Sequence, residues 1–222
     1  MRTEQEVEDA FHSFIGDPRY PCLAARGVWQ RRDYQLNVYG TLGSAAASEA
    51  LAAHLAAFAR DPARSAEDYR FAAFVAVFTG PAPASEVEFE RGLWHQLQQL
   101  HERDDPEAEW DPAVSADPSD PRFSFSFAGT ALFVIGLHPE SSRLARRFQW
   151  PALVFNPRSQ FQRLRRDGRF DRLRDLTRAR DVDLQGSANP NLSNFGERSE
   201  ARQYSGRDTS QEEWRCPFHH RQ

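Results

Sequence analysis

Lysine is missing from this sequence, and the 28 basic residues are all arginines. Schiff-base chemistry needs a lysine amine, and a phosphate-binding loop of the Walker type also needs a lysine, so both are excluded. Arginine is suited to bidentate binding of carboxylate groups. The positive charge that a binding site in this chain can use is therefore guanidinium charge.

Long apolar runs and a strong charge imbalance are also missing. No stretch of 18 apolar residues occurs, so we expect no membrane span. The first residues, MRTEQEVEDAF, lack the apolar core of a secretory signal. A formal net charge of -4 and a pI of about 6.0 provide no overall basic field for nucleic acid. We therefore expect a cytoplasmic protein without nucleic-acid or membrane partners.

Cysteine is scarce, with Cys22 and Cys216 near opposite ends of the chain. Two reduced thiols in a cytosolic protein are favoured over a disulfide that ties the tail to the N-terminus. The final segment, CPFHH, contains residue types that ligate haem or metals, but it has no recognisable zinc spacing. The alternative for this segment is a frayed terminus.

The remaining composition predicts one compact domain, residues 1–222, because 40% hydrophobic residues over this length can build a sizeable core. Helical patterns cover residues 4–15, 44–60, 85–102, 141–148, 160–164 and 170–179; strand patterns cover 33–41, 70–79, 123–127, 131–137 and 151–155. Ser44 is an expected N-cap, and Ser85 with Glu88 forms a capping-box pattern; Gly80 ends the second strand pattern, and Gly129 joins the third to the fourth. These elements do not alternate regularly. The predicted fold class is therefore α+β, with a mixed or antiparallel central sheet flanked by helices and a long ordered C-terminal loop segment.

A single histidine stands out at the end of a predicted strand. His138 follows the apolar run FVIGL and precedes a proline. A strand end holds a side chain rigidly at a pocket, and a neutral imidazole there is a good axial ligand for haem iron. The alternative is a histidine that caps the turn. Arg143, Arg146 and Arg147 follow closely and are candidates for binding haem propionates, the alternative being a solvated basic face.

A long polar tail follows, DLQGSANPNLSNFGERSEARQYSG, residues 183–206. The segment supplies amide, hydroxyl and carboxylate groups for hydrogen bonds. Its apolar residues follow neither a helix nor a strand period. Structureless stretches of this length are uncommon in compact domains, which favours a functional loop around a ligand over a solvated loop.

Three stretches of this sequence resemble the YqcI/YcgG family: GLHPxxSRxxRRF (136–148), PALVFNPxxQFxxLRxxGxF (151–170) and RDxxLQGxxNPxLxxFGxxSEAxQYSG (180–206). The resemblance implies a haem-dependent N-oxygenase that hydroxylates a guanidine or amine nitrogen of an arginine-like or amino-acid-derived substrate. It implies haem b as cofactor, with His138 as the iron ligand and Arg143, Arg146 and Arg147 at the propionates.

The resemblance leaves several points open. The oxidant is expected to be oxygen with an electron donor, or peroxide, and the oligomeric state is undetermined. Glu197 and Glu200, within the tail motif, are the candidates for pairing with a small cationic amine or guanidine substrate. Many relatives have histidine where this chain has Arg158; if that histidine takes part in their chemistry, this chain lacks it and has a narrower or altered activity. Alternatives are amine oxidation to an aldoxime or nitrile, a haem-binding sensor or carrier, and a structural domain without cofactor.

Overall fold

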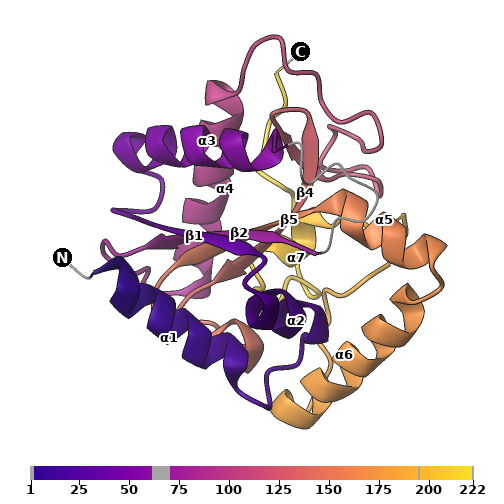
Figure 1. The fold of residues 1–222 in the computed structure, drawn as a ribbon. Coiled ribbons are helices and arrows are strands. Elements are labelled where there is room, and N and C mark those ends of the chain that lie inside the picture. The colour runs from indigo at the N-terminus through magenta and orange to yellow at the C-terminus, as the bar shows by residue number, and fades with distance from the viewer. Residues whose placement is uncertain (1–2, 62–70, 195, 222) are drawn as a thin grey trace.

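One mixed five-stranded sheet forms the centre of the molecule. The computed structural model describes residues 3–61, 71–194 and 196–221 (Figure 1). The strands are β1 (Tyr34–Tyr39), β2 (Ala73–Phe78), β3 (Phe125–Phe127), β4 (Thr130–Leu137) and β5 (Ala152–Pro157), in the order β1-β2-β5-β4-β3. The β1–β2 pair is parallel, and the other three pairs are antiparallel. Residue 70, where the second predicted strand begins, lies outside the described residues.

Helices cover both faces of this sheet (Figure 1). They are α1 (Glu4–Gly16), α2 (Leu23–Arg31), α3 (Ala45–Ala59), α4 (Glu86–Arg103), α5 (Arg158–Arg166), α6 (Phe170–Gln185) and the short α7 (Ala201–Tyr204). The α3 and α4 helices pack on one face, while α1 and α2 pack on the other. The predicted α+β class with a mixed sheet and flanking helices is confirmed.

The glycine before the HP pair explains how closely α4 approaches the sheet. A Cβ atom at Gly136 would lie 2.6 Å from the Phe89 ring and 2.8 Å from Leu93. Both residues belong to α4, so β4 turns the Gly136 side toward this helix. Leu137, its neighbour, belongs to the core on the α1 and α2 face. Alternation along the strand then directs the next side chain toward α4 again.

Two predicted helix starts have the expected hydroxyl caps. Ser44 accepts a hydrogen bond from the backbone N–H of Ala47, and Ser85 accepts one from that of Glu88. At Ser85 the reciprocal half of the capping box is missing, because the Glu88 carboxylate accepts a hydrogen bond from the backbone N–H of Ala84 instead of that of Ser85. The serine signals therefore located the helix starts correctly.

The predicted helix over residues 141–148 is wrong. Only a 3-10 turn, η2 (Leu144–Arg146), forms there. The Leu144 N–H donates to the Gln185 side chain, and the Arg146 carbonyl accepts from the His138 N–H. Partners outside the segment thus replace the hydrogen bonds within a helix. The α2 helix was not predicted, and α6 continues beyond residue 179 until Gly186 ends it with a φ of 79°.

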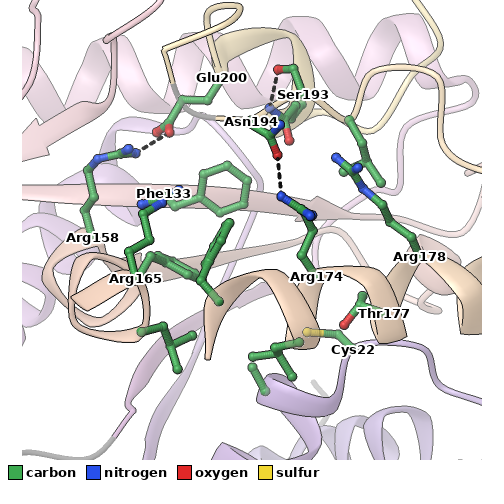
Figure 2. Close-up of a pocket in the computed structure, with 17 residues that line it drawn as sticks. Cys22, Phe133, Arg158, Arg165, Arg174, Thr177, Arg178, Ser193, Asn194 and Glu200 are labelled. Atoms are coloured by element: carbon green, nitrogen blue, oxygen red, sulfur yellow. Dashed lines mark hydrogen bonds and ion pairs between the residues drawn. The ribbon is translucent and has the colours of Figure 1, made fainter. Parts of the chain in front are cut away.

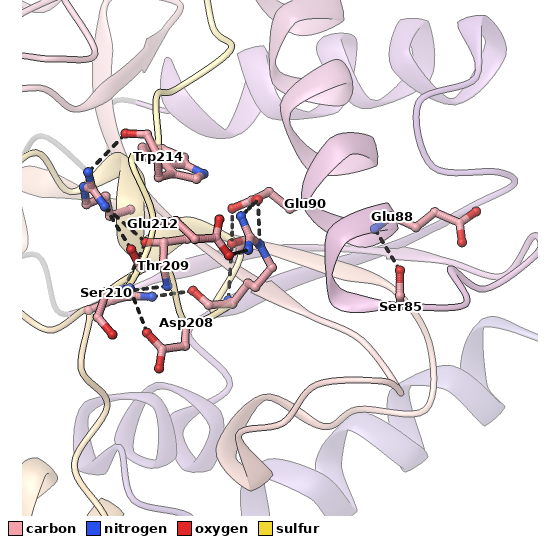
Figure 3. Close-up of polar contacts among 12 residues, drawn as sticks. Ser85, Glu88, Glu90, Asp208, Thr209, Ser210, Glu212 and Trp214 are labelled. Atoms are coloured by element: carbon pink, nitrogen blue, oxygen red, sulfur yellow. Dashed lines mark hydrogen bonds and ion pairs between the residues drawn. The ribbon is translucent and has the colours of Figure 1, made fainter.

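The C-terminal segment is ordered by polar contacts to α4 (Figure 3). The Arg207 guanidinium forms an ion pair with Glu90 at 2.7 Å, and the Ser205 hydroxyl donates to the same carboxylate at 2.9 Å. A second ion pair joins Arg207 to Glu212 at 2.6 Å. Glu90 and Arg207 are nearly buried, so the contact fixes the tail on the helix. The expected long ordered C-terminal segment is therefore present.

We expect the Glu90→Gln substitution to destabilise the protein by about 1.5–3 kcal/mol, the range for hydrogen bonds to charged groups. The amide cannot neutralise Arg207, whose guanidinium is nearly buried. Urea unfolding followed by tryptophan fluorescence measures the loss. Glu88→Gln, at an exposed site on the same helix, is the matched control and should change stability little. Equal effects of the two substitutions would contradict the structural role of this ion pair.

Candidate functional site

An apolar cavity of about 210 Å³ lies among α5, α6, the start of α2 and the tail (Figure 2). Its apolar lining consists of Ala24, Phe133, Phe161, Leu164, Phe170, Leu173 and Leu192; its polar lining consists of Cys22, Arg158, Arg165, Arg174, Thr177, Arg178, Ser193, Asn194, Glu200 and Gln203. Helix α6 contributes residues one turn apart, which places them on one face of the helix. The cavity is therefore apolar inside, with four arginines in its wall.

A second cavity of about 180 Å³ adjoins the first one under α1 and α2. Cys22, Ala24, Phe133 and Phe161 line both cavities. Its wall is mainly aromatic and aliphatic and comes from α1, α2 and the sheet face opposite α4. The two cavities thus form adjacent chambers on one side of the sheet.

Among the described residues that line the first cavity, the only acidic one is already paired with a cation. Glu200 forms an ion pair with Arg158 at 2.5 Å (Figure 2). Its other carboxylate oxygen accepts hydrogen bonds from the hydroxyls of Ser124 at 2.5 Å and Tyr204 at 2.8 Å. Burial raises the pKa of Glu200, while the Arg158 charge and these hydrogen bonds act against that shift. A cationic ligand at Glu200 must therefore compete with Arg158.

The two α6 arginines in the wall differ in their contacts. Arg174 pairs with Asp171 and Asp175 at 2.8 Å and donates to the Asn194 side-chain oxygen at 3.3 Å. Arg178 is half-buried and has no hydrogen-bond or ion-pair partner within residues 3–61, 71–194 and 196–221. Figure 2 shows both side chains extending from α6 toward the tail segment that carries Ser193 and Asn194.

His138 lies on the α4 side of the sheet and does not line either cavity. Its side chain is fully buried, and the Phe89 ring stacks on it with centroids 4.2 Å apart. Neither ring nitrogen has a hydrogen-bond partner in the described part of the chain. Burial, together with the nearby Arg146 charge, lowers the pKa of His138 to about 4. The imidazole is therefore neutral at pH 7.

The three arginines after His138 all bind protein groups. Arg143 is buried and pairs with Asp181 of α6 at 2.5 Å. Arg146 is buried and donates to the carbonyls of Gly136 and Tyr204, and burial lowers its pKa to about 10. Arg147 is exposed and donates to the Ser141 carbonyl. These contacts hold the segment between β4 and β5 against α6 and α7.

The predicted site residues therefore do not form one cluster. Glu200 lines the apolar cavity, whereas Glu197 is exposed, binds Asn194 and borders a separate polar groove that Cys216 also lines. Cys22 and Cys216 are both free thiols. Among the described residues, no group of three or more His, Cys, Asp or Glu side chains is placed to hold a metal ion.

Sequence reasoning missed the cavity and the α6 arginines that face it. The Arg174–Arg178 spacing of four residues was visible, but it does not distinguish a cavity wall from a solvated face. Cys22 carried no local signal of its position between two chambers. The α2 helix that places it was itself not predicted.

This architecture defines an α+β protein with an arginine-lined apolar cavity beside a mixed sheet. The YqcI/YcgG family pattern matches residues 11–219, so the chain belongs to that family. The chain is also similar to "Uncharacterized protein YcgG" of Bacillus subtilis (strain 168), with 27% identity over 208 residues that cover 90% of this chain and 80% of the relative. No solved structure matches it significantly. In the described residues, no helix is both long and apolar enough to span a membrane.

The neutral buried His138 predicts a specific pH dependence. Below pH 6.5 the unfolded chain binds a proton at this residue, whereas the folded chain binds it only near pH 4. Stability should therefore fall by about 3 kcal/mol as the pH drops through this window. His138→Leu removes the titrating group, and urea unfolding between pH 7 and 4 should show a flatter profile. His95→Ala, at an exposed residue of α4, is the control; parallel profiles for His138→Leu and wild type would contradict the assignment.

Proposed function

We propose that this protein is a haem-dependent N-oxygenase that hydroxylates a guanidine or amine nitrogen of an amino-acid-derived substrate. Two arguments support the proposal. The family motifs, including GLHPxxSRxxRRF, resemble those of proteins with this activity. The main structural support comes from His138. Its neutral imidazole is fully buried, and neither ring nitrogen has a hydrogen-bond partner among the described residues. Buried polar groups without a partner are rare and call for an explanation such as a ligand.

The donor chemistry of His138 fits haem iron, because a neutral imidazole nitrogen is the usual proximal ligand. The stacked Phe89 ring covers a face of the imidazole, whereas the nitrogen lone pair that would hold the iron lies in the plane of the ring. Full burial means that no space of even a water molecule's size touches the side chain in this conformation. Haem binding at His138 therefore requires the surrounding segments to move apart.

Helix α7 is the segment that connects His138 to the cavity. The Tyr204 carbonyl accepts a hydrogen bond from Arg146, which acts electrostatically on His138. The Tyr204 hydroxyl donates to Glu200 in the cavity wall. Glu200 directly precedes α7, so a displacement of α7 would release both the Arg146 contact of Tyr204 and the Arg158 ion pair of Glu200. Opening of the tail would thus couple access to the His138 region with release of the Glu200 carboxylate.

Each partner has a defined part in the proposed reaction. Bound haem supplies the oxidising chemistry, with oxygen and an electron donor or with peroxide as the oxidant. The chain holds the imidazole neutral through burial and the Arg146 charge, which keeps a nitrogen lone pair available. Glu200, once separated from Arg158, would bind the cationic substrate nitrogen and orient it. The arginines at positions 143, 146 and 147 are the proposed propionate contacts. In that role Arg143 would have to release Asp181, and Arg146 would have to release its two carbonyl partners.

The cofactor is tested by absorption spectroscopy of protein purified from haem-replete cells. We expect a Soret band near stoichiometric occupancy, which His138→Leu should abolish or shift because leucine offers no ligating nitrogen. His95→Ala and His219→Ala serve as controls that keep the band. Absence of any Soret band and of iron would rule out the haem proposal, and loss of the band in His219→Ala alone would move the axial ligand to the tail.

The substrate class is tested by titrating arginine and simple alkylamines against the Soret band. Glu200→Gln should weaken binding by about 10–150-fold, the loss expected for one charge-assisted hydrogen bond. Glu197→Gln, at an exposed carboxylate in the same motif, should change binding little. A haem protein that binds no cationic amine and forms no N-hydroxylated product would instead be a haem sensor or carrier.

A further inference from the structure

We infer that the two adjoining cavities bind an elongated apolar carboxylate, with its carboxylate at Arg178 and Arg174 and its apolar body in the chambers beyond. This inference does not depend on haem at His138; it concerns the cavity with Glu200 paired to Arg158, whereas the amine proposed above would bind only after that pair opens. It rests on the shape of the cavities, the composition of their walls and the charge at one end.

The shape favours a long and narrow ligand. Chambers of about 210 and 180 Å³ are each smaller than the ~300 Å³ at the lower end of pockets for drug-sized ligands. The residues shared by both walls, which include Cys22 and Ala24, mark where the chambers adjoin. A ligand that occupies both must therefore extend from the α6 side to the region under α1 and α2.

The walls favour an apolar body. Phe133 and Phe161 stand between the chambers, and their rings approach each other edge-on with centroids 5.9 Å apart. The inner chamber continues with side chains of the α1 and α2 core, such as Phe11 and Trp29. A hydrocarbon or aryl group placed there would bury apolar surface on all sides, and each buried methylene stabilises binding.

The charge at the α6 end favours an acid over an amine. Arg178 is half-buried in the wall and has no partner in the described ranges, so it can bind a carboxylate without breaking an ion pair. Arg174 is one turn away on the same face of α6 (Figure 2). Asp175 and Glu197, which act electrostatically on Arg178, are exposed. The acidic residue in the wall, Glu200, is already paired with Arg158.

The first test measures binding of straight-chain carboxylates to haem-free protein by isothermal titration calorimetry. We expect dodecanoate to bind, with dodecylamine and dodecanol much weaker, because the latter two cannot pair with a guanidinium. Arg178→Gln should weaken dodecanoate binding by about 10–150-fold. Arg172→Gln, an exposed arginine of the same helix, is the matched control and should leave it unchanged. Equal binding of acid and amine, or equal effects of the two substitutions, would overturn the inference.

The second test locates the ligand. In a Cys216→Ser background, Cys22 is the remaining thiol, and it lies in both cavity walls. Dodecanoate should slow its alkylation by N-ethylmaleimide, whereas dodecanol at the same concentration should not. Unchanged alkylation at saturating dodecanoate would place the acid elsewhere and overturn the inference.

The third test uses chain length. Ala24→Phe adds a ring where the chambers adjoin. Octanoate should still bind in the outer chamber, whereas dodecanoate should no longer bind more tightly than octanoate. Retention of the full chain-length dependence would show that the inner chamber is not used. These measurements use haem-free protein. A negative result in them therefore does not bear on the haem proposal, and a missing Soret band does not bear on carboxylate binding.

Discussion

The arrangement of this protein depends on one buried carboxylate, that of Glu200. A charge removed from water must be compensated by a partner charge and by hydrogen bonds, or it strongly destabilises the fold. Arg158 at the start of α5 supplies the charge, and the hydroxyls of Ser124 and Tyr204 supply the hydrogen bonds. These partners tie together α5, the segment before β3 and α7. The wall of the cavity is therefore positioned by electrostatics as well as by apolar packing.

The sheet separates the two regions with the most distinctive chemistry. His138 packs against α4, whereas both apolar chambers lie on the opposite face. Since a strand directs successive side chains to opposite faces, neighbouring motif residues serve different sides. Helix α7 contacts both through Tyr204. The motif ending in QYSG is thus a structural link between two regions that the sequence alone suggested were one site.

The arginines show how far local patterns predict structure. The motif segment over residues 141–148 was predicted as a helix, but its arginines instead bind specific protein groups. Arg143 forms an ion pair with Asp181, which lies 38 residues later on α6, and Arg146 donates hydrogen bonds to two backbone carbonyls. A helix does not form here, because these long-range contacts and the hydrogen bond to Gln185 stabilise an irregular turn more than the local helical propensity stabilises a helix.

Sequence alone determined the elements that rest on local physics. The strand before Gly80 follows from its continuous apolar run. The helix starts at Ser44 and Ser85 follow from hydroxyl hydrogen bonds to the backbone. The hairpin at Gly129 follows from the positive φ angle that glycine adopts readily. Only the tertiary structure decided which charges meet. Glu200 and Arg158 are 42 residues apart, and nothing in the spacing of either predicts the other. Ion pairs and cavities depend on how whole elements pack, and that packing is absent from any local window of sequence.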